Sequence, residues 1–254
     1  KKLPVFDAVT STNGKDANLI AKSSLIGNVN QTRIVNSGFN YPSDKTLRPS
    51  ASSTQALSLI NANTIGIRNI GIGFTSLRGN TTGIDNVGVG NAVLYTNTVG
   101  KNNVAVGAYG LYKNTTGCEN VAVGLKASMC NTTGTFNVAV GSCSLLCNTI
   151  GYSNVAIGRN TLKENTTGYF NVALGDQALR QNTTGVSNVG IGYLALLTNT
   201  IGHSNVSLGR ETLRLNTTGC QNVAIGAFAL CKNTTGCQNT GSGSYSLFSN
   251  TTGY

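Results

Sequence analysis

Side chains that could carry acid, base or nucleophilic chemistry are sparse in this 254-residue chain. Its one histidine is His203. From residue 63 onward the acids are Asp85, Glu119, Glu164, Asp176 and Glu211. This part of the chain is filled by a sequence repeat, and no two of the acids occupy the same position in adjacent copies. General acid-base catalysis needs paired groups whose environments tune their pKa values. We therefore expect neither an enzyme nor a cofactor.

Glycine pairs give the only hint of a nucleotide site. Gly71-Ile72-Gly73 and Gly190-Ile191-Gly192 match the first half of a dinucleotide-binding fingerprint. That fingerprint needs a following helix, and no helical pattern follows either pair. Glycine recurs at the same position in every copy of the repeat, as at Gly73 and Gly192, so we interpret these glycines as corners of a repeated structure.

The seven cysteines carry more information. Cys130 and Cys147, and likewise Cys220 and Cys237, occupy the same position in adjacent copies of the repeat. In neighbouring coils of a stacked repeat, such pairs would have a Cα spacing that a disulfide can span. The alternatives are that cysteine fills small, half-buried positions, or that it binds a metal. The odd count and the lack of a Cys-x-x-Cys spacing disfavour both a full disulfide framework and a zinc site.

A strict 17-residue repeat organises the chain. Asparagine recurs without insertion or deletion from Asn63 to Asn250, and we number each repeat from this residue. Position seven is again Asn, from Asn69 to Asn239, and position eleven is Gly. A period this strict indicates a stack of identical supersecondary units.

A short strand is expected between positions seven and eleven. Positions eight and ten are large and aliphatic, whereas position nine is only Ala, Gly or Ser. This alternation predicts a strand whose positions eight and ten pack in the core. The expected core residues are Val104, Val106, Val121, Val123, Val138, Val140, Val155, Ile157, Val172 and Leu174, together with Leu179 and Leu196 of position fifteen. Small residues at position nine indicate a close approach by another chain or another sheet. Its members include Ala105, Ala122, Ala139, Ala156 and Ala173.

Asn-Thr-Thr-Gly segments are the expected corners, because Gly adopts positive φ and Asn hydrogen-bonds its own backbone in turns. The turn ladder includes Asn114, Asn131, Asn165, Asn182, Gly117, Gly134 and Gly168. Each repeat would then form one coil with two short strands and two bends. The predicted fold is an all-β, parallel β-solenoid of 17-residue coils, with stacked Asn and Thr ladders.

Two segments divide the chain. Residues 1–62 lack the repeat and hold all three prolines, and we interpret them as an anchoring or capping segment. A flexible leader is the alternative. Residues 63–254 would form a shaft of eleven repeats plus the start of a twelfth.

The formal charge is +10, but basic residues are scattered through the repeats without a continuous row. We therefore expect no nucleic-acid partner. Tyrosines occupy the same variable positions: Tyr109, Tyr112, Tyr152, Tyr169 and Tyr193. They indicate either carbohydrate or protein contacts, or half-buried packing between coils.

A family resemblance follows from the motif Asn-Val-Ala-Val/Ile-Gly. Residues 137–141, 154–158 and 222–226 resemble the repeat of trimeric autotransporter adhesin heads, which is shorter. The longer unit, with Asn-Thr-Thr-Gly before and Ala-Leu after, is similar to repeats in fibre proteins of phages, large viruses and some bacteria. The resemblance implies a homotrimer with position nine at the three-fold contact.

That resemblance also implies a function. We expect a structural fibre shaft or adhesin of a virion or phage tail that contributes to attachment to a host surface, through a glycan or a protein. Its location would be the virion surface or outside the cell, with the N-terminal segment as its anchor to a virion, tail or cell surface. A bacterial surface trimeric adhesin is the alternative, and an ice-binding solenoid is a remote one. Consecutive threonines disfavour the last, because in extended backbone they point to opposite faces.

Overall fold

The computed structural model describes residues 6–9, 18–21 and 66–253. The chain divides into two compact units, Lys1–Thr54 and Gln55–Tyr254. In the first unit, β1 (Phe6–Val9) pairs antiparallel with β2 (Asn18–Ala21). The rest of residues 1–62 lies outside the described residues, so its role as an anchor or cap stays a prediction.

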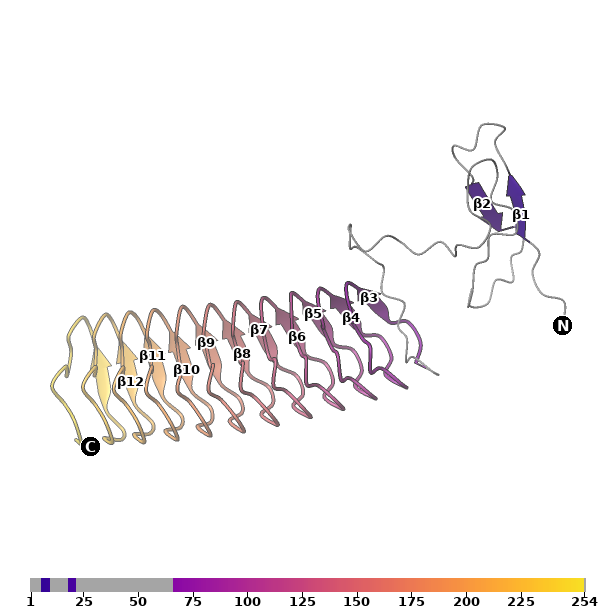
Figure 1. The fold of residues 1–254 in the computed structure, drawn as a ribbon. Coiled ribbons are helices and arrows are strands. Elements are labelled where there is room, and N and C mark those ends of the chain that lie inside the picture. Colours follow the sequence, from indigo (N-terminus) through magenta and orange to yellow (C-terminus); the bar gives the residue numbers. More distant parts are fainter. Residues whose placement is uncertain (1–5, 10–17, 22–65, 254) are drawn as a thin grey trace. The chain divides into compact units, whose positions relative to one another are not determined.

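The second unit is a row of coils with one three-residue strand in each (Figure 1). The strands are β3 (Ile70–Ile72), β4 (Val87–Val89), β5 (Val104–Val106), β6 (Val121–Val123), β7 (Val138–Val140), β8 (Val155–Ile157), β9 (Val172–Leu174), β10 (Val189–Ile191), β11 (Val206–Leu208), β12 (Val223–Ile225) and β13 (Thr240–Ser242). They form one 11-stranded sheet in which each strand pairs parallel with the strand of the next coil, as Val104 pairs with Val121. The predicted all-β, parallel solenoid with one coil per repeat is confirmed.

The strands face the opposite way from the prediction. Ala105 is 0% exposed inside its coil, whereas its neighbours Val104 and Val106 are each 37% exposed on the outside. The same pattern holds from coil to coil, so the predicted small-residue contact face is wrong: Ala105, Ala122, Ala139, Ala156 and Ala173 are core residues. The predicted strand core is wrong too, because these side chains lie on the outer face: Val104, Val106, Val121, Val123, Val138, Val140, Val155, Ile157, Val172 and Leu174. Leu179 and Leu196 are fully buried.

Position nine is small because the chain itself approaches it. A Cβ built on Gly190 would lie 3.3 Å from the side chain of Leu179, at position fifteen. Where position nine is Ser207, its hydroxyl donates to the carbonyl of Thr212, at position fourteen of the same coil, at 3.0 Å. Positions fourteen and fifteen therefore form the wall opposite the strand. The gap between the two walls therefore leaves room only for a small residue at position nine.

This opposite wall is a turn and not the expected second strand. Its residues at positions thirteen and fifteen have positive φ, for example 59° at Gln177 and 50° at Leu179. Non-glycine residues rarely adopt that region. Leucine accepts it here because the left-handed bend places its side chain in the interior, where Leu179 is fully buried.

Buried asparagine ladders join successive coils. At position one, Asn165 donates its amide N–H groups to Asn148 Oδ1 at 2.8 Å and to the Gly168 carbonyl at 3.0 Å. At position seven, Asn154 also donates to the Gly168 carbonyl, at 2.8 Å. The backbone N–H and the amide of Asn171 both donate to Asn154 Oδ1, each at 3.1 Å. From Gly83 to Gly236, each Gly carbonyl of position four thus accepts from two asparagines of adjacent coils.

Only glycine fits at position four. A Cβ on Gly168 would lie 2.3 Å from Asn165 Oδ1 and 2.5 Å from the Gly185 carbonyl of the next coil. The predicted turn residues occupy this network: Asn114, Asn131, Asn165, Asn182, Gly117, Gly134 and Gly168.

We predict that enlarging position nine destabilises the coil. Ala156→Leu overfills the thin interior, and we expect the free energy of unfolding to fall by about 1–3 kcal/mol. Ala227→Leu is the matched control, because it makes the same change at position twelve, where another coil carries the exposed Leu125. Thermal unfolding followed by circular dichroism measures both. Equal midpoints for the two variants would contradict the inward orientation of position nine.

We predict that the asparagine ladder is essential for stability. Asn171→Ala removes one of the two donors to the Gly185 carbonyl and leaves the Asn188 backbone N–H without its partner, and a buried group without a partner costs about 1–3 kcal/mol. The exposed Asn91, whose side chain lies outside the ladder, provides the control variant Asn91→Ala. Chemical denaturation should show a large loss for the first variant and almost none for the second. A near-neutral Asn171→Ala would argue that the ladder adds little stability.

Candidate functional site

Within the described coils, four of the five acids of the repeats, all but Glu119, form ion pairs with arginines. Arg68 pairs with Asp85 in the next coil at 2.6 Å, and its hydrogen bonds lower the pKa of that carboxyl. Arg159 also pairs with a carboxylate of the next coil, Asp176, at 2.8 Å. The exposed His203 has the Ser204 hydroxyl close to its ring, at 3.4 Å from Nδ1. Among the described residues, no three His, Cys, Asp or Glu side chains form a group that could hold a metal ion.

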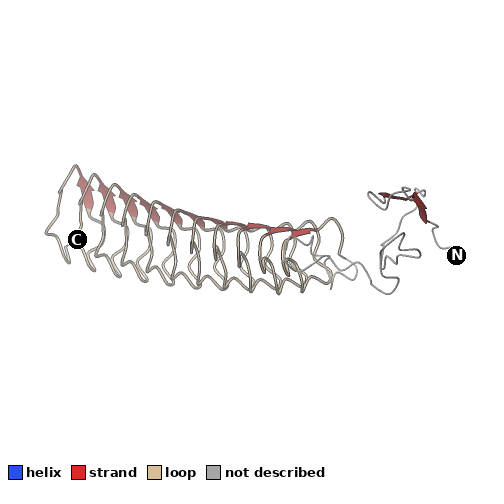
Figure 2. Ribbon diagram, turned by 45° about the horizontal axis from the view of Figure 1, so that its top comes forward, coloured by secondary structure: helices blue, strands red, loops and turns tan. Residues whose placement is uncertain are grey.

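The outer face of the sheet carries what we call the aliphatic strip. It consists of the outward side chains at positions eight and ten of β3 to β13, of which 20 of 22 are Val, Ile or Leu. The two exceptions, Thr240 and Ser242, lie in β13, the last strand. No charged residue occurs in the strip, and exposure in it reaches 51% at Ile70. Figure 2 shows the strands that carry it along one side of the row of coils.

Such a strip is unusual for a free surface. Parallel sheets normally have both faces covered. Soluble monomers rarely leave long, contiguous apolar patches exposed, and large ones mark interaction sites. Sequence reasoning missed this surface because it assigned large aliphatics to the interior. The signal was available, since the residue between them is too small to belong to a solvent-facing strand position.

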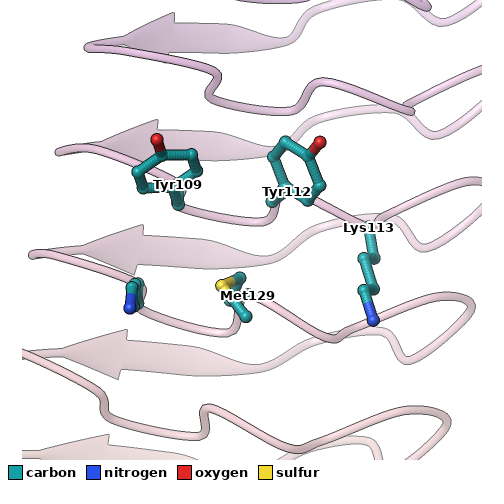
Figure 3. A pocket seen from close by; sticks show the side chains of 5 residues that line it. Tyr109, Tyr112, Lys113 and Met129 are labelled. Carbon is teal, nitrogen blue, oxygen red and sulfur yellow. The ribbon is translucent and has the colours of Figure 1, made fainter.

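A hollow lies on the wall opposite the strands. Its lining comes from Tyr109, Tyr112, Lys113, Lys126 and Met129, and its volume is about 400 Å³. In Figure 3, Tyr109 and Tyr112 project from one coil and Met129 from the next, with Lys113 extending toward that next coil. Lys126 and Met129 were not predicted. They occupy the same positions of the next repeat as the two tyrosines do in theirs, so the period itself places them there.

The tyrosines stack mainly between coils. Tyr112 stacks on Tyr95 with ring centroids 5.0 Å apart and meets Tyr109 edge-on at 5.8 Å. Tyr152 and Tyr169 stack at 4.8 Å. Packing between coils therefore explains this last pair. Tyr193 is 46% exposed, and no ring stack involves it among the described residues.

The cysteines are free thiols in this structure. Within one predicted pair, the Cys220 backbone N–H donates to Cys237 Sγ at 3.1 Å. In the other pair, Cys147 has a raised pKa, chiefly because of burial and then because of nearby Cys130. Both pairs thus lie in neighbouring coils, and their cross-linking stays a prediction. Burial also raises the pKa of Cys231, which is 6% exposed.

Comparison of the chain with protein-family models, curated proteins and solved structures gave no match. The fold therefore defines its class by itself: a parallel β-solenoid repeat protein. Within the described residues, no helix has the length and apolarity needed to cross a bilayer.

We predict unequal reactivity of the thiols. The thiolate is the reactive form, so a raised pKa and burial should make Cys231 the slowest to alkylate in the native protein, several-fold slower than Cys118. Iodoacetamide labelling at pH 8 with peptide mass spectrometry gives the rate at each site. In urea the two rates should converge. Equal native rates would contradict the burial of Cys231.

Proposed function

We propose that this chain is the shaft of a trimeric, non-enzymatic fibre on a virion or phage tail, and that it contributes to attachment to a host surface. One observation carries the proposal: the uncharged aliphatic strip runs along the strands of the solenoid. Burying a face of this kind stabilises the assembly that covers it, by roughly 25 cal/mol per Å² of apolar area removed from water.

The natural partner for the strip is another copy of the same chain. Every coil from β3 to β12 presents the same pair of aliphatic side chains, so two copies aligned in parallel match coil by coil. A third copy encloses the strips around one axis. The number three comes from the resemblance of Asn-Val-Ala-Val-Gly repeats to trimeric adhesin heads. The subunit contact then consists of positions eight and ten, in place of the alanines of position nine.

The remaining faces would stay accessible in such an assembly. Because position nine points inward against positions fourteen and fifteen, positions thirteen and sixteen lie on the wall away from the strip. That wall carries the tyrosine hollow and several basic residues, which suit contacts with a glycan or protein of the host. The N-terminal segment, residues 1–62, would attach the fibre to its virion, tail or cell surface. Its location is accordingly the virion surface or the outside of the cell.

We predict that charge in the strip dissociates the assembly. The chain has a mass of 26.2 kDa, so light scattering behind size exclusion should give about three times that value. Val138→Asp with Val155→Asp places two carboxylates in the apolar contact, and this variant should elute as a folded monomer. Thr133→Asp with Thr167→Asp is the control, because position three is exposed outside the strip.

The outcomes separate the parts of the proposal. If the native protein is a monomer, the proposed assembly is rejected. A dimer would keep the strip as a subunit contact and reject the three-fold arrangement. Circular dichroism of each variant shows whether the solenoid itself survives the substitutions.

A further inference from the structure

We infer that the hollow formed by Tyr109, Tyr112, Lys113, Lys126 and Met129 binds a glycan residue that carries a carboxylate. The inference rests on the proposed attachment role, and it names the ligand class and the place of contact. It concerns a single chain, because all five residues come from two adjacent coils of one solenoid (Figure 3).

The shape of the hollow suits a single sugar ring. It is a shallow hollow of about 400 Å³ that is largely open to solvent, so one sugar ring would rest against its surface. Two tyrosine rings and a methionine supply apolar walls against which the C–H face of a sugar packs, and the tyrosine hydroxyls can exchange hydrogen bonds with sugar hydroxyls.

The tyrosine walls are held in place before any ligand arrives. Tyr112 stacks on Tyr95 at 5.0 Å, and the Arg78 guanidinium lies over the other ring of that stack, 5.3 Å from its centroid. Tyr109 meets Tyr112 edge-on at 5.8 Å. Rings fixed in this way lose little conformational entropy on binding.

The charge of the hollow selects an acid. Lys113 and Lys126 are both exposed, and neither belongs to an ion pair among the described residues. Lys101, Lys163 and Lys232 also belong to no ion pair among the described residues, but Lys113 and Lys126 differ from them because both line one hollow. Two unpaired ammonium groups at one small hollow favour a carboxylate that receives charge-assisted hydrogen bonds from them.

A sugar acid fits better than a nucleic acid. A single-stranded nucleic acid needs a basic groove that follows its backbone over several nucleotides. Here the cations do not continue: the coil after Lys126 and Met129 has Cys143, Leu146 and Cys147 at the equivalent positions. The site is therefore local and limited to one or two sugar residues.

The test uses the full chain at 150 mM salt with four probes: 3′-sialyllactose, trigalacturonate, lactose as the neutral match, and a ten-nucleotide single-stranded DNA. Calorimetry or ligand-observed NMR measures binding. We expect at least one acidic sugar to bind about tenfold more tightly than lactose. Lys113→Ala with Lys126→Ala should weaken that binding about tenfold or more.

The control variant removes the same charge elsewhere. Lys101→Ala with Lys163→Ala lies outside the hollow and should leave binding unchanged. The inference is overturned if neither acid binds better than lactose, if both double variants lose affinity equally, or if the DNA binds more tightly than the sugars through Lys113 and Lys126. Unchanged unfolding midpoints confirm that each variant folds.

Light scattering on the same samples separates this inference from the proposed assembly. If the protein forms trimers but binds no acidic sugar, the trimeric shaft is supported and the glycan site is rejected. If the protein binds the sugar as a monomer, the glycan site is supported and the trimeric shaft is rejected.

Discussion

The carbonyl of the position-four glycine is the point on which the solenoid depends. From Gly83 to Gly236 it accepts one amide N–H from the asparagine three residues before it and another from the position-seven asparagine of the preceding coil, as at Gly168. Because these groups are buried, losing any member leaves a polar atom without a partner. Every coil must therefore place its two asparagines and its position-four glycine carbonyl at the same points along the coil. This requirement explains why the repeat tolerates no insertion or deletion between Asn80 and Asn250.

The polar ladders also determine what fills the interior. The two asparagines of each coil are inside with one leucine, such as Leu162, and small residues such as Ala156. Opposite these side chains, position nine of the strand has room only for a small residue, as the tight surroundings of Gly190 show. Large aliphatics are consequently left on the outside of the strand. The buried asparagine ladders and the apolar outer face of the strands thus have one cause.

Much of the architecture could be predicted from the sequence. The period predicted parallel strands in register, and the Asn and Gly positions predicted ladders and corners, because those depend on residue types that recur without exception. The facing of the strand was predicted wrongly. Alternation distinguishes two faces but does not say which is inside, and hydrophobicity favoured Val104 over Ala105. The deciding feature is the left-handed backbone at residues such as Leu179, which brings the opposite wall close. Neither composition nor propensity reveals a leucine at positive φ.

The residues of the tyrosine hollow were predicted only in part. Tyr109 and Tyr112 were expected at the surface, but Lys126 and Met129, one period later, were not.

The two sides of the coil differ in how freely they can change. Positions eight and ten repeat the same aliphatic chemistry from β3 to β12, which is what the proposed contact with identical copies requires. Positions twelve, thirteen, sixteen and seventeen have no part in the asparagine ladders, and they differ from coil to coil. Because the ladders, the strand pairing and the buried leucines do not involve the side chains at these variable positions, a substitution there changes the surface chemistry with little effect on the stack. The proposed contact between copies requires the same residues in every coil, whereas a binding site for one ligand requires residues that differ from coil to coil. A hollow that occurs in one pair of coils, bounded by Tyr109 and Lys126, is what such a division of surfaces leads one to expect.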